Sequence, residues 1–333
     1  MTAPIHTAWL AKRVLVTGAS GFLGSWVAKE LVDQGAHVVC LIREIVPDSY
    51  LNLSGTTPRV LQVPGELEDY PGLVRIFNEH EIDTCFHLAA QPIVTVALRN
   101  PVSTFDSNIR GTWNVLEAVR TVAPACRIVV ASSDKVYGDA HALPYLETFP
   151  LSGLGPYDVS KVCTDLLAQS YARMYGLRVA IARCGNFYGP GDLNWSRIVP
   201  GTSRALAEGR RPVIRSDGTH LRDYLYIGDA ALAYLELALH LENGLPSGEA
   251  FNFGTERPTS VLAVVEQLTA MSGRSDLQPE ILNEARNEIQ SQYLSIDKAR
   301  RTLNWTSRVD LAEGLAVTYR WYEDLLRRRA ARV

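Results

Sequence analysis

The chain has 333 residues, of which 47% are hydrophobic and 21% are charged, a composition typical of a large globular α/β core with a smaller lobe. A net charge of −3 without a basic stripe argues against nucleic acid as a partner, and the absence of long apolar runs argues against a membrane span. The first ten residues lack a secretory signal pattern and the five cysteines lack metal-type spacing, so we expect a reduced, cytoplasmic setting and no metal site.

Short apolar runs alternate with helical patterns from residue 13 to about residue 185. Strands connected by helices require right-handed crossovers, which build a parallel sheet covered on both faces. We therefore predict an α/β fold with a Rossmann-type, doubly wound parallel sheet in residues 1–185. The expected strands are 13–17, 37–42, 60–63, 84–88, 128–132 and 178–183, and the expected helices are 24–34, 70–80, 102–122 and 157–175.

The alternation loosens from residue 186 onward. Residues 186–197 are rich in Gly, Asn, Asp and Pro, which is typical of a loop, and the remainder mixes short strands with helices. We predict that residues 186–333 form mainly a smaller α/β lobe that binds substrate above the C-terminal edge of the sheet. Segments near 225–255 are expected to return to the first domain.

A glycine-rich loop at residues 17–24 follows the first predicted strand and opens the first helix. Its G-x-x-G-x-x-G spacing lets the backbone turn tightly and approach a pyrophosphate, which then lies at the helix N-terminus. Residues after the second, third and fourth strands would complete a dinucleotide site. The candidates are Gly18, Ser20, Gly21, Phe22, Leu23, Gly24, Arg43, Glu66, Leu67, Leu88, Ala89 and Ala90.

The sequence leaves the choice between NAD and NADP open. The second strand ends at Ile42 and Arg43, without the carboxylate commonly expected there for the adenosine ribose. Arg43 could face a 2′-phosphate and select NADP, or it could stack on adenine or simply be exposed. Glu66 could accept a hydrogen bond from the adenine amino group.

Two segments supply candidate catalytic side chains. Tyr157 and Lys161 are four residues apart and share one face of a predicted helix, where the ammonium can lower the pKa of the phenol. The hydroxyl of Ser133, at the end of an apolar strand, could help to take a proton from a substrate alcohol. Asp134 and Lys135 follow. Neighbours on a strand point to opposite faces, so these two side chains converge only if the chain bends after Ser133.

As a set, these motifs resemble the extended short-chain dehydrogenase/reductases of the NAD-dependent epimerase/dehydratase family, which act on nucleotide sugars. The resemblance runs from about residue 12 to about residue 322. It rests on G-A-S-G-F-L-G (18–24), H-L-A-A (87–90), Y-D-V-S-K (157–161), R-C-G-N-F-Y-G-P-G-D (183–192) and R-D-Y-L-Y-I-G-D (222–229). Within the family, residues 87–94, 133–138 and 185–200 are most similar to the CDP-glucose 4,6-dehydratases.

The resemblance implies a reaction in three stages. Tyr157, as a phenolate beside Lys161, would take the proton from the sugar O4 while hydride leaves C4 for the nicotinamide, and Ser133 would bond the same oxygen. Asp134 would protonate the C6 hydroxyl so that it leaves as water, while a base removes the C5 proton, and hydride would then return to C6. Lys135, where TDP-glucose enzymes have Glu, could be a neutral base, a cation that stabilises an enolate, or an exposed side chain paired with a carboxylate. The nicotinamide ends as it began, so tight binding of the cofactor, by Tyr157 and Lys161 among others, is expected.

The resemblance also implies partners and substrate contacts. The substrate would be a nucleotide-diphosphate sugar, with CDP-glucose favoured, and the chain would form a homodimer through helices 102–122 and 157–175. The candidate substrate-binding residues are Gln91, Asn186, Arg197, Arg215, Arg222 and Glu288.

Other functions remain open at this point. Residues 222–224 have the generic family form, and the loop with Arg43 also departs from the CDP-glucose pattern, so the reaction type is better supported than the nucleotide. A 4-epimerase would use the same Tyr157 and Lys161 but would not need Asp134. An NADP-dependent reductase and a non-catalytic dinucleotide-binding regulator are further alternatives.

Overall fold

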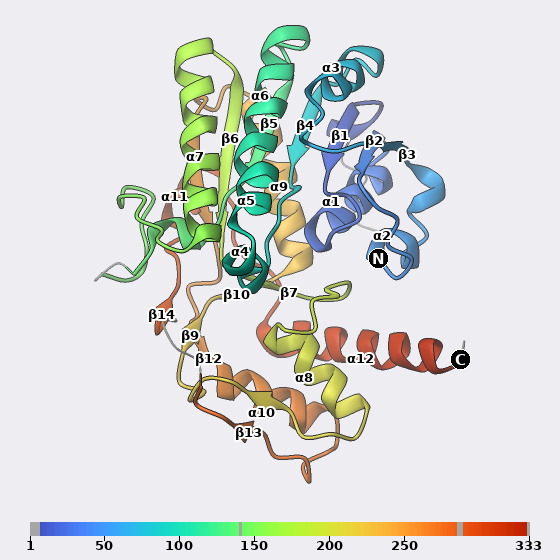
Figure 1. Ribbon diagram of the computed structural model, residues 1–333, viewed down its shortest axis with the longest axis vertical. Helices are drawn as coiled ribbons and strands as arrows, with labels where there is room; N and C mark the ends of the chain where they lie inside the picture. Colours follow the sequence, from blue (N-terminus) through green and yellow to red (C-terminus); the bar gives the residue numbers. More distant parts are fainter. Residues whose placement is uncertain (1–6, 140–141, 285–288, 332–333) are drawn as a thin grey trace.

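The computed structural model describes residues 7–139, 142–284 and 289–331. Its centre is a seven-stranded sheet in the order β11-β6-β5-β4-β1-β2-β3, with every neighbouring pair parallel (Figure 1). The strands are β1 Arg13–Thr17, β2 His37–Ile42, β3 Leu61–Pro64, β4 Thr84–His87, β5 Arg127–Ala131, β6 Arg178–Cys184 and β11 Glu249–Phe253. The strand order reverses between β1 and β4, and ligands bind beside such a switch point at the C-terminal ends of the strands. The predicted Rossmann-type fold is confirmed.

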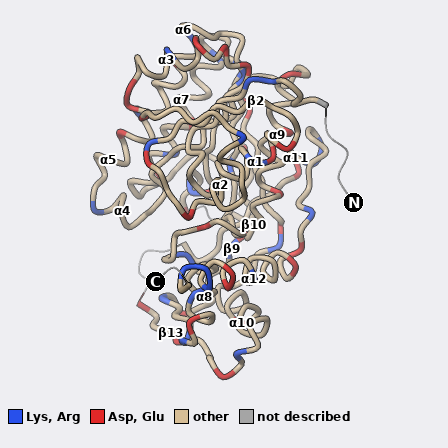
Figure 2. The backbone as a smooth tube through the Cα atoms, turned by 90° about the vertical axis from the view of Figure 1, so that its right-hand side faces the viewer, with Lys and Arg blue, Asp and Glu red and all other residues tan. Residues whose placement is uncertain are grey.

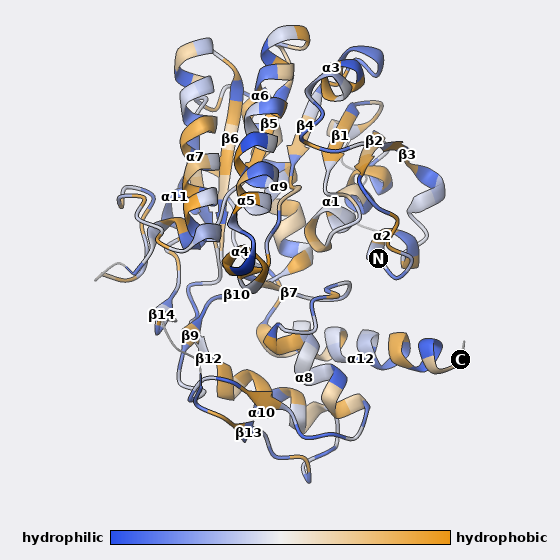
Figure 3. Cartoon of the chain, viewed as in Figure 1, coloured by the Kyte–Doolittle hydropathy of each residue, from blue (hydrophilic) through white to orange (hydrophobic). Residues whose placement is uncertain are grey.

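Helices cover both faces of this sheet, and each face has its own hydrophobic core. One face carries α1 Phe22–Asp33, α9 Ile227–Glu242 and α11 Asp297–Leu303; the other carries α3 Tyr70–Glu79, α6 Gly111–Val122 and α7 Pro156–Tyr175. Most side chains of the central strands β1, β4, β5 and β6 are apolar, because both faces of these strands are buried (Figure 3). The alternation of short apolar runs and helical patterns in the sequence therefore corresponds to these layers of strands and helices.

The predicted helix over residues 102–122 is interrupted in the structure. It begins as α5 Pro101–Phe105, continues through one wide π turn, η3 Asp106–Arg110, and ends as α6. A π turn inserts an extra residue into a helix and often occurs at a functional site. Here it turns Asn108 into the protein interior, where the side chain is buried.

The second lobe lies below the C-terminal edge of the sheet in Figure 1. Its helices α8 Ile198–Ala207, α10 Val261–Met271 and α12 Leu311–Ala330 share one hydrophobic core. Short strands complete it: β7 Asn186–Tyr188 with β10 Tyr224–Tyr226, β8 Val213–Ile214 with β13 Glu280–Ile281, and β9 Leu221–Arg222 between β12 Thr259–Ser260 and β14 Ser291–Gln292. Between the two parts of this lobe's sequence, α9 and β11 return to the main sheet.

Shorter elements join these layers. They are η1 Thr7–Trp9, α2 Tyr50–Leu53, η2 Thr57–Arg59, α4 Val94–Arg99 and η4 Asp134–Tyr137. Basic and acidic residues are scattered over the molecule, and a basic run marks the last turn of α12 (Figure 2). Arg329 in this run donates from Nε to Asp48 Oδ2 at 2.9 Å, which connects the second lobe to the segment after β2. Among the described residues, no helix combines the length and apolar character needed to cross a bilayer.

Candidate active site

A cavity of about 1390 Å³ runs from the glycine-rich loop, along the C-terminal ends of the strands, to the second lobe. Sites for a single small ligand typically measure about 300–1000 Å³, so this cavity has room for more than one ligand. All twelve cofactor candidates from the glycine-rich loop to Ala90 line it, as do all five predicted catalytic residues.

The glycine-rich loop has the geometry of a pyrophosphate cradle. Gly18 has a φ of +72°, and a Cβ at Gly24 would lie 2.1 Å from the Gly18 carbonyl oxygen, so the loop closes on α1 only with glycine at both positions. Gly21, the N-cap of α1, provides no side-chain cap, which leaves the first amides of the helix available to an anion. Thr17 Oγ1 accepts from the Leu88 and Ala89 amides at 3.0 and 3.1 Å and fixes the neighbouring strand end. These residues fit a dinucleotide.

The end of the cavity beside β2 and β3 carries charges of both signs. Arg43 and Glu66 both line it, together with Glu44. The Arg43 guanidinium forms an exposed ion pair with Glu44, with Nη2 and Oε1 3.3 Å apart. The Glu44 carboxylate therefore lies one residue after Arg43, at an end of the cavity where the sequence pattern indicated only the positive charge of Arg43.

The chain bends directly after β5. The predicted convergence of Asp134 and Lys135 requires such a bend. Ser133 is the N-cap of η4, and its Oγ accepts from the Lys135 amide at 3.2 Å and donates to Asp134 Oδ1 at 3.0 Å. Asp134 is 3% exposed, and its second oxygen, Oδ2, has no hydrogen-bond partner among the described residues. The Lys135 ammonium contacts Gln292 Oε1 of β14. Asp134 and Lys135 consequently both line the cavity.

The first two turns of α7 carry the other predicted catalytic pair. Burial raises the pKa of Tyr157 to about 12, and the charge of Arg197 and a hydrogen bond with the Ser133 side chain oppose this effect. Burial lowers the pKa of Lys161 to about 8, partly offset by the charge of Asp165, and Lys161 Nζ donates to the Ala131 carbonyl at 2.8 Å. Lys161 therefore loses its proton before Tyr157 does, and its charge can assist the phenol only below about pH 8.

The predicted substrate-binding residues are divided between several places. Asn186, Arg197, Arg215 and Arg222 line the cavity, and the three arginines give the side of the second lobe a positive charge suited to a diphosphate. Arg197 Nη1 lies 3.0 Å from the buried Asp192 Oδ2. Gln91 is not part of the lining. Its side chain bonds both the amide and the carbonyl of Ile93. Glu288 lies outside the described residues.

The structure adds residues that the sequence pattern did not single out. Asn108, in the π turn, accepts from the Gln91 amide at 2.7 Å and donates to Ser160 Oγ at 2.8 Å, so it joins the strand-end loop to α7. Asp158 lines the cavity beside Tyr157, and burial raises its pKa. A carboxylate directly after the tyrosine was visible in the sequence, but no signal there indicated the π turn.

Comparison with known proteins identifies the family to which the chain belongs. The model of the NAD dependent epimerase/dehydratase family matches residues 14–254. The chain belongs to this family. The expected resemblance is thereby confirmed, and this epimerase/dehydratase is an enzyme of that family.

Relatives of both reaction types are similar to this family member. CDP-glucose 4,6-dehydratase of Salmonella typhimurium is 29% identical over 336 residues, covering 96% of this chain and 92% of the relative. UDP-glucose 4-epimerase of Thermotoga maritima, solved with UDP-glucose, has a TM-score of 0.86 at 28% identity, covering 94% and 99% of the two chains. A dTDP-glucose 4,6-dehydratase of Streptomyces venezuelae, solved with NAD, has a TM-score of 0.85 at 27% identity, covering 94% and 97%. The NAD complex supports NAD binding by this epimerase/dehydratase.

Proposed function

We propose that the protein is a nucleotide-sugar 4,6-dehydratase that converts an NDP-hexose, with CDP-glucose favoured, to the NDP-4-keto-6-deoxyhexose. The proposal rests on one observation, the buried carboxylate of Asp134. Asp134 lines the cavity, and its oxygen Oδ2 has no hydrogen-bond partner among the described residues. A buried polar atom without a partner is costly unless a ligand satisfies it. A substrate hydroxyl at this position would do so, and a proton donor at this position is what the loss of water requires.

Oxidation at C4 is the first step. Tyr157 takes the proton of the sugar O4, and Ser133, whose hydroxyl also bonds the phenol, holds the same oxygen. The Lys161 ammonium favours the phenolate below about pH 8. When bound, NAD would supply the acceptor for the C4 hydride and later return this hydride to C6, and the base that took the C5 proton would give it back to C5. The glycine-rich loop and the first amides of α1 would hold its pyrophosphate.

Elimination of water follows because the C4 ketone makes the C5 hydrogen acidic. As the general acid of this step, Asp134 would give a proton to the departing C6 hydroxyl, which leaves as water. Lys135 faces the same cavity and would remove the C5 proton when neutral or stabilise the enolate when charged. The three cavity arginines, Arg197, Arg215 and Arg222, would bind the diphosphate.

We further propose NAD rather than NADP as the cofactor, and a homodimer as the functional form. The Glu44 carboxylate beside Arg43 would repel a 2′-phosphate, which favours NAD. Helices α4 to α7 pack side by side and expose large apolar side chains, which supports pairing with a second copy. These side chains include Val96, Leu98, Val102, Trp113, Leu166 and Met174.

A 4-epimerase is the second candidate, and it is favoured by the epimerases among the structural relatives. The two reactions share C4 oxidation and differ in whether the product loses water. Purified protein should therefore be incubated with NAD and, in separate reactions, with CDP-, dTDP-, UDP- and GDP-hexoses. The masses of the products should then be measured by mass spectrometry. Loss of one water from one of these sugars supports the dehydratase, whereas a new C4 stereoisomer of unchanged mass would overturn it.

A further inference from the structure

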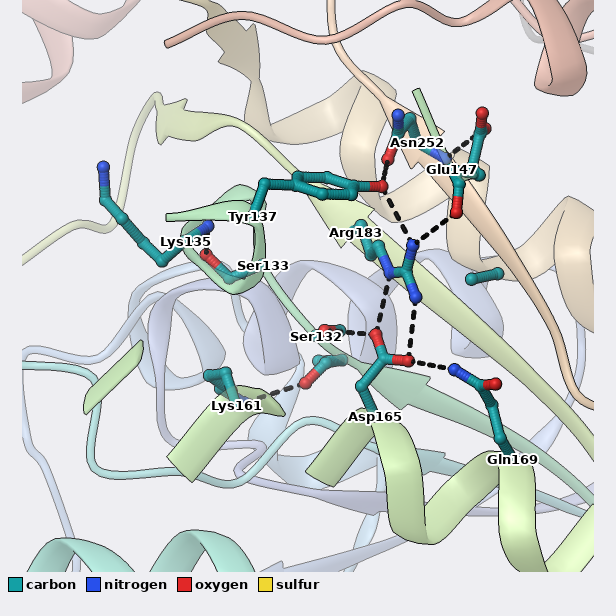
Figure 4. A network of polar contacts seen from close by, with 12 residues as sticks. Ser132, Ser133, Lys135, Tyr137, Glu147, Lys161, Asp165, Gln169, Arg183 and Asn252 are labelled. Atoms are coloured by element: carbon teal, nitrogen blue, oxygen red, sulfur yellow. Dashed lines mark hydrogen bonds and ion pairs between the residues drawn. The ribbon is translucent and has the colours of Figure 1, made fainter. Parts of the chain in front are cut away.

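A buried ion pair lies directly behind the cavity. Arg183 of β6 donates from Nε to Asp165 Oδ2 at 2.8 Å and from Nη2 to Oδ1 at 2.9 Å, and the two side chains are 3% and 0% exposed (Figure 4). Neither residue lines the cavity. Burying two charges costs so much desolvation that an apolar pair of the same size often serves stability equally well. The contacts of the pair show which segments it holds together.

Asp165 links the two segments that carry the predicted catalytic residues. It lies one turn after Lys161 on α7, and its Oδ2 accepts from Ser132 Oγ at 2.9 Å. Ser132 immediately precedes Ser133, the N-cap of the turn that begins at Asp134. One carboxylate thus ties the helix of Lys161 to the strand end of Ser133.

Arg183 holds the far end of the same turn. Its Nη1 donates to Tyr137 Oη at 3.0 Å and to the Glu147 carbonyl at 3.2 Å. Tyr137 is the last residue of η4, and its hydroxyl donates to Asn252 Oδ1 of β11 at 2.7 Å. In Figure 4 the guanidinium lies between Tyr137 and Asp165, with its donors directed at both. The ion pair therefore reaches both ends of the segment that carries Asp134 and Lys135.

The pair also sets the charge near Lys161. The Asp165 carboxylate favours the ammonium form of Lys161, whereas burial disfavours it. His87 of β4 is neutral near pH 8, because burial and the Lys161 charge lower its pKa to about 3. Other titratable groups of this region are Tyr157 and Asp158 on α7, Asp134 and Lys135 on η4, Cys184 on β6 and Tyr234 on α9. Burial raises the pKa values of Tyr157, Asp158, Cys184 and Tyr234, and the tyrosines and the cysteine are neutral at this pH.

We propose that Asp165 and Arg183 are positioning residues for the oxidation step: their ion pair fixes the Ser133–Asp134 turn against α7 and keeps the Lys161 ammonium in place beside Tyr157. The inference rests on the Tyr157–Lys161 chemistry of the proposed function, which a dehydratase and an epimerase share. It assigns no contact with substrate to either residue.

The small number of lysines makes a direct test possible. The chain has five, Lys12, Lys29, Lys135, Lys161 and Lys298, so lysine labelled with ¹³C at Cε gives at most five NMR signals, and Lys161→Arg assigns the one of interest. Asp165→Asn should lower the midpoint of the Lys161 titration by about one pH unit or more, because it removes the nearby negative charge. Asp165→Glu should restore it. An unchanged midpoint in a folded Asp165→Asn variant would overturn the charge role.

Two further variants separate position from charge. Ser132→Ala removes the link to Asp165 without changing any charge, so kcat should fall about tenfold while the Lys161 midpoint stays in place. Gln169→Ala is the matched control, since Gln169 donates to the same carboxylate at 2.7 Å from the next helical turn and should alter neither quantity. Wild-type kcat in Ser132→Ala would overturn the positioning role.

The NMR titration needs no substrate. If the wild-type protein turns over no nucleotide sugar, the proposed function fails, and the Lys161 midpoint alone still decides the role of the ion pair. If Asp165→Asn does not fold, the kcat of Ser132→Ala decides whether the ion pair has a positioning role.

Discussion

Replacing Gly24 by alanine should separate cofactor binding from general stability. A Cβ at this position would lie 2.1 Å from the Gly18 carbonyl oxygen and 2.6 Å from its carbon, both of which are backbone atoms that cannot rotate away. A carbon–oxygen contact needs about 3.3 Å, so the loop and the start of α1 must separate by about 1 Å. That displacement moves the first helix amides away from the pyrophosphate.

The expected cost follows from the hydrogen bonds that the displacement weakens. A hydrogen bond to a charged group contributes about 1.5–3 kcal/mol, so the loss of one such bond lowers the affinity for NAD by about 10- to 100-fold. Overpacking of the loop should in addition reduce the free energy of unfolding by about 1–3 kcal/mol. Calorimetric titration of the nucleotide-free protein with NAD, together with thermal unfolding, measures both quantities.

Gly176→Ala provides the matched control. Gly176 ends α7 with a φ of +70°, and nothing lies within 4 Å of an added Cβ, so alanine there incurs backbone strain without a clash. This variant should lose about 1 kcal/mol of stability and keep wild-type affinity for NAD. If Gly24→Ala binds NAD as the wild type does, the pyrophosphate does not lie on this loop and the reasoning is refuted.

Three other predictions concern the rest of the site. The value of kcat/KM should fall as the pH rises through about 8, because the Lys161 ammonium is lost above its lowered pKa, and a pH–rate profile without this limb would contradict the role of that charge. Arg222→Met should raise KM for the nucleotide sugar by about tenfold or more and leave the affinity for NAD unchanged, as steady-state kinetics and titration would show. Trp113→Glu and Leu166→Glu should each convert a dimer to monomers in analytical ultracentrifugation, since both side chains belong to the exposed apolar surface of α4 to α7; a dimer of unchanged affinity would place the interface elsewhere.

Local patterns in the sequence predicted much of this architecture. The sequence predicts the six strands up to residue 184 within about one residue of their observed ends, because most of them are short runs of buried, mainly apolar side chains; the edge strand β3 is largely exposed. The glycine spacing identified the first turn, and the four-residue spacing placed Tyr157 and Lys161 on the same side of α7. The sequence indicates that Asp134 and Lys135 converge only if the chain bends after Ser133, but the sequence pattern does not show that this bend forms.

The remaining features depend on contacts between distant parts of the chain. Asp165 and Arg183 are 18 residues apart, and the partner of Lys135, Gln292, is 157 residues away. The sequence pattern predicted a regular helix where the π turn instead directs Asn108 inward, because a single inserted residue hardly disturbs helical periodicity. Lys161 was expected to lower the pKa of Tyr157, but burial lowers its own pKa to about 8 and limits that effect to lower pH.

The most direct test of the proposed dehydratase is a comparison of the wild-type protein with Asp134→Asn on CDP-glucose and NAD, with the product mass followed over time. The wild type should yield a sugar lighter by one water, and Asp134→Asn should lose this product while it still oxidises C4, seen as NADH absorbance. The surface variant Asp276→Asn, whose carboxylate pairs with Arg274 outside the cavity, should behave as the wild type. A wild-type product of unchanged mass, or dehydration by Asp134→Asn at the wild-type rate, would contradict the account.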